Sequence, residues 1–334
     1  MMNNIFSAAV MEPPALTSIT PEIISITKVP GAGPMKHLLK LQDLSEAKLS
    51  ALLDSADRLK KEKQQGINYP YLKGKTLGMI FEKASTRTRI SFEAGMYQLG
   101  GSALFLSSND LQIGRGEPIE DTARVLSRYL DGVMIRTFSQ QMVETLAAYS
   151  SIPVINGLTD YAHPCQVLAD LMTIREYKGR LNGLKMAYIG DGNNMANSLM
   201  AGAALTGIEL TIACPEGYHP DPELTKWAQA RSQLLITDSP EQAVCGADIV
   251  YTDVWSSMGQ ESEVEKRRID FAGYQVNQAL MEKAQPGAMV MHCLPAHRGE
   301  EISAETLESH ANEIFDQVEN RLHAQKAVLL ELLG

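Results

Sequence analysis

The chain has 334 residues, more than a single hydrophobic core usually supports, so two domains are expected. Apolar residues make up 44% and charged residues 21%, as in an ordinary globular protein, and no apolar run approaches the roughly 18–20 residues of a membrane span. The formal net charge of −10 argues against broad nucleic-acid binding but leaves room for a local anion site.

The first 34 residues differ in composition from the rest. They contain five prolines, two glycines, no arginine and only three charged residues, without a periodic apolar face. A secretory signal would need a basic start and a continuous apolar stretch, and a transit peptide would need arginines. We therefore expect residues 1–34 to be a poorly ordered extension, or the product of a start codon upstream of a true start at Met35.

Regular patterns begin after Pro34. Between Ser45, an expected N-cap, and Gly66, an expected helix end, apolar residues recur at the spacing of one helix face: Leu49, Leu52, Leu53, Ala56 and Leu59. Short apolar segments then alternate with helical patterns, and we predict strands at residues 76–81, 103–106, 132–135 and 153–155.

A second alternating series follows a predicted helix at residues 164–177. Its predicted strands are residues 185–189, 209–213, 234–236, 248–252 and 288–292. Strands that alternate with helices indicate parallel sheets covered on both faces. We therefore expect an α/β protein with two doubly wound parallel-sheet domains, residues 35–156 and 157–319, and a C-terminal helix (residues 320–334) that returns to the first domain.

The strand predicted at residues 76–81 runs into a segment with the chemistry of a phosphate site. Ser85, Thr86, Arg87, Thr88 and Arg89 begin the next predicted helix, so hydroxyls, guanidinium groups and free first-turn N–H groups converge. Guanidinium binds phosphate oxygens bidentately. The alternative is a capping box with solvent-facing arginines, and this segment alone does not decide between the two.

Two further polar segments lie where parallel strands deliver ligands. Arg136 follows the strand at 132–135 directly. His163 and Gln166 flank Pro164, which suits the first position of a helix, so both lie at its positive dipole end. A histidine that merely caps a turn is the alternative for His163.

Together these segments resemble the aspartate/ornithine carbamoyltransferase (transcarbamylase) family, from about residue 37 to the C-terminus. Ser-Thr-Arg-Thr-Arg after a strand, followed at a long interval by His-Pro-Cys-Gln, is specific to that family. The resemblance implies that residues 85–88 bind the phosphate of carbamoyl phosphate. It also implies that Arg136 and His163 hold the carbonyl oxygen, and that Gln166 holds the amide nitrogen.

The resemblance also implies an assembly. Gln112, within Asp110-Leu-Gln-Ile-Gly-Arg-Gly116, matches the loop that reaches into a neighbouring subunit's site in this family. We therefore expect a homotrimer, or an assembly of trimers, with sites shared between subunits.

Candidate residues for the second substrate lie in the second domain. Gly190-x-Gly192 after a strand admits a dinucleotide-binding interpretation, but Met195 fills the third glycine position and Asn193 with Asn194 would crowd a pyrophosphate. By resemblance, Asn194 instead contacts the amino-acid end of ornithine.

The segment Asp253-Val-Trp-Ser-Ser257-Met258-Gly259 follows the strand at 248–252 and matches the family's ornithine loop. The resemblance implies that Asp253 pairs with the α-ammonium, and that Ser257 and Met258 contact the α-amino and carboxylate groups. An exposed loop with an incidental acid is the alternative.

The last matched motifs are His292-Cys293-Leu294-Pro295 after the strand at 288–292, and Glu319-Asn-Arg321. The resemblance places Cys293 beside the reacting amine. It also places Cys293 and Leu294 in the carbamoyl phosphate site, to which Arg321 returns. A metal site at His292-Cys293 or His163-x-Cys165 would be unusual, because zinc sites have tighter paired spacing. We expect no metal and no cofactor.

The expected reaction transfers the carbamoyl group of carbamoyl phosphate to the side-chain amine of L-ornithine, giving L-citrulline and phosphate in arginine metabolism. Arg136, His163 and Thr88 would stabilise the oxyanion of the tetrahedral intermediate. Cationic surroundings make a Cys293 thiolate plausible, which would accept the amine proton together with, or instead of, the departing phosphate. The pattern leaves open whether the role is biosynthetic or catabolic.

Three rival functions remain: two enzymes with a different acceptor substrate, and a protein that does not catalyse the reaction. Aspartate as acceptor would need cations for a second carboxylate, and putrescine would remove the reason for contacts to α-amino and carboxylate groups. A silent paralogue acting as a scaffold is the third. Four scattered cysteines without a paired framework (Cys165, Cys214, Cys245 and Cys293) favour reduced thiols and a cytoplasmic location.

Overall fold

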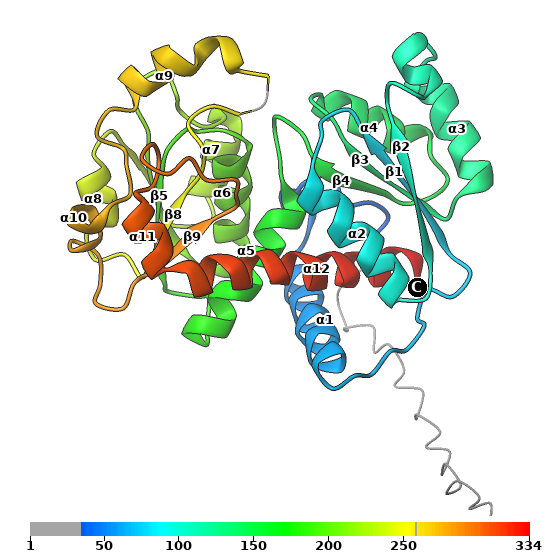
Figure 1. Ribbon diagram of the computed structural model, residues 1–334, viewed down its shortest axis with the longest axis horizontal. Coiled ribbons are helices and arrows are strands. Elements are labelled where there is room, and N and C mark those ends of the chain that lie inside the picture. Colours follow the sequence, from blue (N-terminus) through cyan, green and yellow to red (C-terminus); the bar gives the residue numbers. More distant parts are fainter. Residues whose placement is uncertain (1–34, 258) are drawn as a thin grey trace, which may run out of the picture.

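Two parallel sheets organise the chain into two lobes in the computed structural model, which describes residues 35–257 and 259–334 (Figure 1). The expected N-terminal extension (1–34) and Met258 lie outside the described residues. Each predicted strand segment overlaps an observed strand, so the α/β doubly wound fold predicted from the alternating pattern is confirmed.

The first sheet has the strand order β2-β1-β3-β4, and all neighbouring strands are parallel. Its elements are η1 (Leu41–Asp43), α1 (Glu46–Gln64), β1 (Thr76–Phe81), α2 (Thr86–Gln98), β2 (Ser102–Ser107), η2 (Gln112–Arg115), α3 (Ile119–Tyr129), β3 (Gly132–Arg136), α4 (Gln140–Tyr149) and β4 (Val154–Leu158). Ser45 caps α1 as predicted, because its side chain accepts from the Lys48 N–H. β4 runs to Leu158, beyond the predicted segment, because Asn156 and Gly157 interrupt the apolar pattern without ending the strand.

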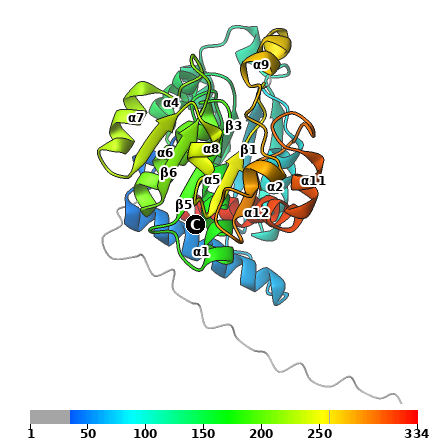
Figure 2. The ribbon, with the colours of Figure 1, turned by 90° about the vertical axis from the view of Figure 1, so that its left-hand side faces the viewer.

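The second sheet has the order β7-β6-β5-β8-β9, again parallel throughout. Its elements are β5 (Lys185–Ile189), α6 (Asn194–Thr206), β6 (Glu209–Ala213), α7 (Pro222–Gln229), β7 (Leu234–Thr237), α8 (Pro240–Val244), β8 (Ile249–Thr252), η3 (Glu261–Glu263), α9 (Val264–Asp270), α10 (Gln278–Met281), β9 (Met289–His292) and α11 (Ala304–Ser309). Successive residues of β5 enter two separate hydrophobic clusters, with Met186 and Tyr188 on one face and Ala187 and Ile189 on the other. Figure 2 views this lobe from its outer side.

Helices α5 (Pro164–Lys178) and α12 (Ala311–Leu333) connect the lobes, and α12 runs from the second lobe to the first beside α1, α2 and α5 (Figure 1). Pro164 occupies the first position of α5 as predicted. All residues from 164 to 174 are buried, because α5 is covered from both lobes. Among the described helices, none combines the length and the apolar character that a membrane span requires.

The start of the last helix was predicted wrongly. α12 begins at Ala311 rather than at residue 320, and α11 before it was not predicted. The first turns of α12 bury the polar Gln317 alongside Ile314, so they show no continuous apolar stripe. His310 at the N-cap makes no side-chain cap hydrogen bond, so the sequence carries no start signal there.

Candidate active site

The carboxyl ends of both sheets border one cavity of about 820 Å³, where α/β folds bind their ligands. Residues from both lobes line it. The predicted site residues among them are Ser85, Thr86, Arg87, Arg136, His163, Asn194, Asp253, Ser257, Cys293, Leu294 and Arg321. The structure therefore brings together side chains that are up to 236 positions apart, between Ser85 and Arg321.

The N-terminus of α2 forms one wall of the cavity. Ser85 is the N-cap, and its Oγ accepts a hydrogen bond from the Thr88 N–H at 3.2 Å. The N–H groups of Thr86 and Arg87 belong to the first turn, which has no carbonyl partner within the helix. This wall therefore offers N–H donors and a positive dipole end to an anion.

Three arginines surround that helix end without a counter-charge. Arg136 and Arg321 are buried, Arg87 is partly buried, and the Nε of each is buried without a hydrogen-bond partner. No ion pair within the described residues includes any of the three. Burial, with Arg321 and Arg87 nearby, lowers the pKa of Arg136 to about 9. Such a cluster requires an anionic ligand to neutralise it.

Thr88 holds two of these arginines in place. Its Oγ1 accepts from Arg321 Nη2 at 2.8 Å and from Arg136 Nη1 at 3.4 Å. Thr88 is fully buried and does not line the cavity, so its hydroxyl acts on the arginines in this structure.

His163 is the N-cap of α5, and its backbone N–H donates to Ser198 Oγ at 2.7 Å. Burial and the nearby Arg321, Arg136 and Arg87 hold the pKa of His163 well below its usual 6.5. The imidazole is therefore neutral, and its Nδ1 is buried without a partner. A neutral imidazole can donate one hydrogen bond to a carbonyl oxygen without a proton being transferred.

Besides Thr88, two predicted residues do not line the cavity. Gln166 is buried one turn into α5, where its Nε2 donates to Asp170 Oδ1 at 2.8 Å. Gln112 is exposed in η2 and does not line the cavity of its own chain. Its delivery to a neighbouring subunit's site stays a prediction.

The second lobe contributes a carboxylate whose hydrogen bonds are already made. Asp253 follows β8, and it accepts from the Val254 N–H at 2.8 Å, from Asn193 Nδ2 at 3.2 Å and from Cys293 Sγ at 2.9 Å. Asn194 begins α6 and donates to the Thr159 carbonyl at 2.6 Å. This half of the cavity is polar, but its groups are paired with one another.

The thiolate expected at Cys293 is wrong for the unliganded site. Burial and the adjacent Asp253 raise the pKa of Cys293 well above its usual 9, so the thiol keeps its proton and donates a hydrogen bond to the carboxylate. The sequence predicted a thiolate because it placed cationic residues near Cys293. The motif does not reveal the burial of Cys293 or its contact with Asp253, which are the two causes of the high pKa.

Several lining residues were not predicted. Lys83 is buried, pairs with Asp160 and lies 4.1 Å from the centre of the Phe138 ring. It stands two residues before Ser85, so its position after β1 was a usable signal. The other unpredicted polar lining residues come from scattered loops and from α9, and gave no such signal: Asn193, Ser256, Gln260, Arg268, His297 and Glu300.

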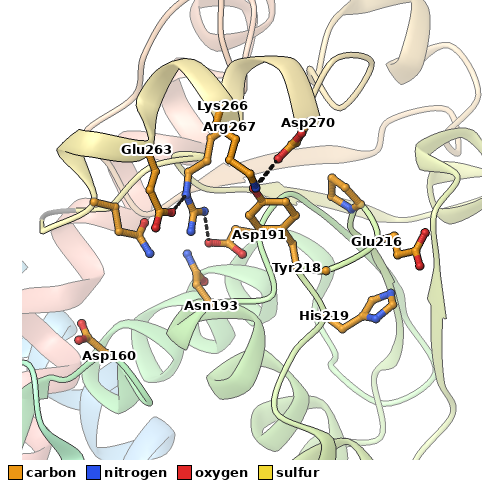
Figure 3. A pocket seen from close by; sticks show the side chains of 13 residues that line it. Asp160, Asp191, Asn193, Glu216, Tyr218, His219, Glu263, Lys266, Arg267 and Asp270 are labelled. Carbon is orange, nitrogen blue, oxygen red and sulfur yellow. Dashed lines mark hydrogen bonds and ion pairs between the residues drawn. The ribbon is translucent and has the colours of Figure 1, made fainter.

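Arg267 on α9 fastens the loop that follows Asp253 (Figure 3). This buried guanidinium donates from Nη1 to Asp191 Oδ2 and to the Trp255 carbonyl, both at 2.8 Å, and from Nε to Glu263 at 2.9 Å. Beside it, a second cavity of about 850 Å³ shares Asp160, Asn193 and Gln260 with the first. One side chain therefore ties the end of β5, the loop and α9 together.

The local geometry also argues against a dinucleotide site at Gly190-x-Gly192 and a metal site at His292-Cys293. A Cβ at Gly192 would collide with the backbone of residues 218–220, and the Gly192 N–H donates to the Tyr218 carbonyl at 2.8 Å. This glycine therefore serves close loop packing, and the space a pyrophosphate would need is filled. Asp253, His292 and Cys293 could together reach a metal ion, but both ring nitrogens of His292 are occupied, by Glu301 at 3.0 Å and by the Leu294 N–H at 2.8 Å.

Comparison with known proteins gives a consistent result. Two sequence models match, "Aspartate/ornithine carbamoyltransferase, carbamoyl-P binding domain" over residues 36–176 and "Aspartate/ornithine carbamoyltransferase, Asp/Orn binding domain" over residues 182–332. The chain is 57% identical over 304 residues to the ornithine carbamoyltransferase of Oceanobacillus iheyensis, covering 90% of this chain and 94% of that protein.

Solved structures agree. The ornithine carbamoyltransferase of Pyrococcus furiosus superposes with a TM-score of 0.87 at 49% identity, over 91% of this chain and 98% of that one. The anabolic ornithine carbamoyltransferase of Campylobacter jejuni gives 0.84 at 44% identity, over 88% and 98%. This chain therefore belongs to the aspartate/ornithine carbamoyltransferase family.

Proposed function

We propose that this protein transfers the carbamoyl group of carbamoyl phosphate to the side-chain amine of L-ornithine, giving L-citrulline and phosphate. The observation that carries the proposal is the cluster of Arg87, Arg136 and Arg321, which lacks a counter-ion and faces Asp253 and Cys293 across one cavity. The names of its relatives, ornithine carbamoyltransferases at more than half identity, support ornithine as the acceptor.

In this proposal the first lobe binds the donor substrate. The hydroxyls and N–H groups of residues 85–87 and the arginines bind the phosphate, while Thr88 keeps Arg136 and Arg321 in position. Arg136 and the neutral His163 donate to the carbonyl oxygen and stabilise its negative charge as the tetrahedral intermediate forms. The acceptors for the carbamoyl NH₂ group are Gln166 and the Leu294 carbonyl.

The second lobe binds the acceptor amine. Asp253 pairs with the α-ammonium of ornithine, and Asn194, Ser257 and Met258 contact its α-amino and carboxylate groups. The side-chain amine has a Lys-like pKa of about 10.4 and must lose a proton before it attacks. Because Cys293 is a protonated thiol in the unliganded site, it orients the amine, and Asp253 or the departing phosphate takes the proton. The C–N bond forms, the C–O bond to phosphate breaks, and no covalent enzyme intermediate is needed.

We also propose a trimer with sites shared through Gln112. The edge strand β2 exposes Leu104 and Phe105, and α2 beside it exposes Ile90 and Tyr97. An exposed apolar edge of this kind favours coverage by another chain. A cytoplasmic location and a role in arginine metabolism complete the proposal; the four described cysteines are free thiols, as a reducing compartment would keep them.

A steady-state assay of the full chain tests the reaction. Citrulline should form from carbamoyl phosphate and ornithine, with a much higher kcat/KM for ornithine than for aspartate or putrescine. Faster carbamoylation of either rival acceptor would refute ornithine as the substrate. No product with any of the three would favour a catalytically silent paralogue.

A further inference from the structure

A buried carboxylate lies behind the cavity, one turn along α5 from Gln166. Asp170 has no exposed surface and accepts three hydrogen bonds, from Gln166 Nε2 at 2.8 Å, Gln317 Nε2 at 2.7 Å and the Tyr251 hydroxyl at 3.1 Å. No ion pair within the described residues includes it. Because a buried charge is costly to keep without a cation, this arrangement calls for an explanation beyond packing.

The carboxylate decides how the Gln166 amide is turned. An ionised carboxylate only accepts hydrogen bonds, so the NH₂ end of Gln166 must face Asp170 and its Oε1 must point away. That Oε1 is buried and has no hydrogen-bond partner. A buried acceptor without a donor indicates a donor supplied by a ligand.

The rest of the donor-substrate site offers the opposite chemistry. Arg87, Arg136 and Arg321 are cations that donate, and His163, three residues before Gln166, is held neutral among them. Only an acceptor can recognise an NH₂ group, whereas a phosphate or a carbonyl oxygen is served by the donors. Gln166 therefore supplies at this end of α5 an acceptor that the arginines cannot.

We propose that Asp170 is a positioning residue that makes the site selective for a carbamoyl over an acetyl phosphate. It does so by locking Gln166 with its oxygen toward the NH₂ group of the donor substrate. This rests on the proposed function, since it concerns the recognition of carbamoyl phosphate. If Asp170 became a hydrogen-bond donor, the Gln166 amide could rotate and turn its own NH₂ toward the NH₂ of the carbamoyl group. The preference for carbamoyl over acetyl phosphate would then fall.

The pKa of Asp170 agrees with a role that depends on its ionisation. Burial raises that pKa to about 7, while the hydrogen bonds from Gln166, Gln317 and Tyr251 and the charge of Arg321 oppose the rise. Asp170 in turn contributes to raising the pKa of its titratable neighbours, the Cys293 thiol and the Tyr251 hydroxyl. Selectivity for the carbamoyl group should therefore increase as the pH rises through about 7. Acetyl phosphate carries the same phosphate group and contacts the same arginines. Changes in the charge of those groups with pH therefore affect both ligands alike and largely cancel in the ratio of the two affinities.

The test compares wild-type enzyme with Asp170→Asn, which keeps the shape but adds a donor. Carbamoyl phosphate affinity is measured from citrulline formation, and acetyl phosphate and inorganic phosphate are measured as competitive inhibitors. We expect Asp170→Asn to weaken carbamoyl phosphate about tenfold or more, as loss of a buried hydrogen bond does, and to leave both inhibitors within about twofold of wild type.

Tyr251→Phe is the matched control. It removes the bond to Asp170 Oδ2 but leaves the Gln166 bond to Oδ1, so at pH 8.5 the ratio of carbamoyl to acetyl phosphate affinity should stay near that of the wild type. Because the Tyr251 bond opposes the rise in the pKa of Asp170, the pH at which selectivity appears should move upward in this variant. An unchanged ratio in folded Asp170→Asn would overturn the inference, as would an equal loss of all three ligands, which marks a structural role. If Asp170→Asn does not fold, the wild-type ratio between pH 6 and 8.5 decides, and a flat profile refutes the inference. Failure of the wild type to form citrulline would instead refute the proposed function.

Discussion

The two halves of the cavity differ in whether their hydrogen-bonding groups already have partners. We call them the donor half, the proposed carbamoyl phosphate side on the first lobe, and the acceptor half, the proposed ornithine side on the second. On the first lobe, Arg87, Arg136 and Arg321 keep buried donor atoms unpaired, so these donors are available to an anion. On the second lobe, Asp253 already accepts from Cys293, Asn193 and its own neighbour, so a ligand must displace existing bonds. The first half gains new hydrogen bonds when its ligand binds, whereas the second half exchanges bonds within the protein for bonds to its ligand. We therefore expect changes in the first half to have the larger effects on binding.

Arg87→Ala should break the first half most severely. A lost charge-assisted hydrogen bond costs about 1.5–3 kcal/mol, or roughly a tenfold to 150-fold loss of carbamoyl phosphate affinity. Ornithine affinity, measured at saturating carbamoyl phosphate, should change little. Arg124→Ala is the control, because Arg124 is exposed and its partners, Asp121 and the Tyr149 ring, do not line the cavity. Near-normal carbamoyl phosphate affinity in Arg87→Ala would disprove the phosphate site.

Mixed assemblies sharpen the comparison by asking whether the first half is complete within one chain. Gln112→Ala and Arg136→Ala chains should each be nearly inactive alone. If Gln112 is supplied by a neighbour, each mixed trimer holds one intact site, and activity should return on mixing. Verified mixed trimers without activity would show that the site is not shared through Gln112.

The same contrast explains what the sequence could predict. The donor half lies largely in contiguous segments at strand ends, so residues 85–88, Arg136 and His163 became candidates once the three segments were taken together and their resemblance to one family was seen. The state of the acceptor half depends on contacts between distant strands. The bond between Cys293 and Asp253 reverses the expected thiolate, and no local pattern encodes it. Asp170 was missed for a similar reason. In the sequence it is an acidic residue among mainly apolar ones in α5, and two of its partners come from the distant α12 and β8.

In the acceptor half, Cys293→Ala should have a larger effect than Cys293→Ser. Serine can still donate to Asp253, whereas alanine leaves that carboxylate with one donor fewer. We expect a rise in ornithine KM of a few-fold for serine and about tenfold for alanine, with carbamoyl phosphate KM unchanged in both. A high pKa also predicts slow alkylation of Cys293 in the unliganded enzyme near pH 7. Rapid alkylation there, or equal losses for serine and alanine, would favour a thiolate after all.

The smallest effect is expected at Arg267, which touches the acceptor half only through the loop it fastens. Lysine keeps the charge but cannot reach Asp191, Glu263 and the Trp255 carbonyl together, so Arg267→Lys should loosen the segment between Asp253 and α9. Ornithine KM should rise about twofold, because part of the loop ordering must then accompany binding. Phosphate affinity, measured by inhibition with inorganic phosphate, should not change, since Arg267 does not line the donor side. A parallel loss of phosphate affinity would mean that the two halves are coupled through this loop. The donor half could then no longer be regarded as preorganised independently of the acceptor half. The contrast between the halves would then reduce to the order in which the two substrates bind.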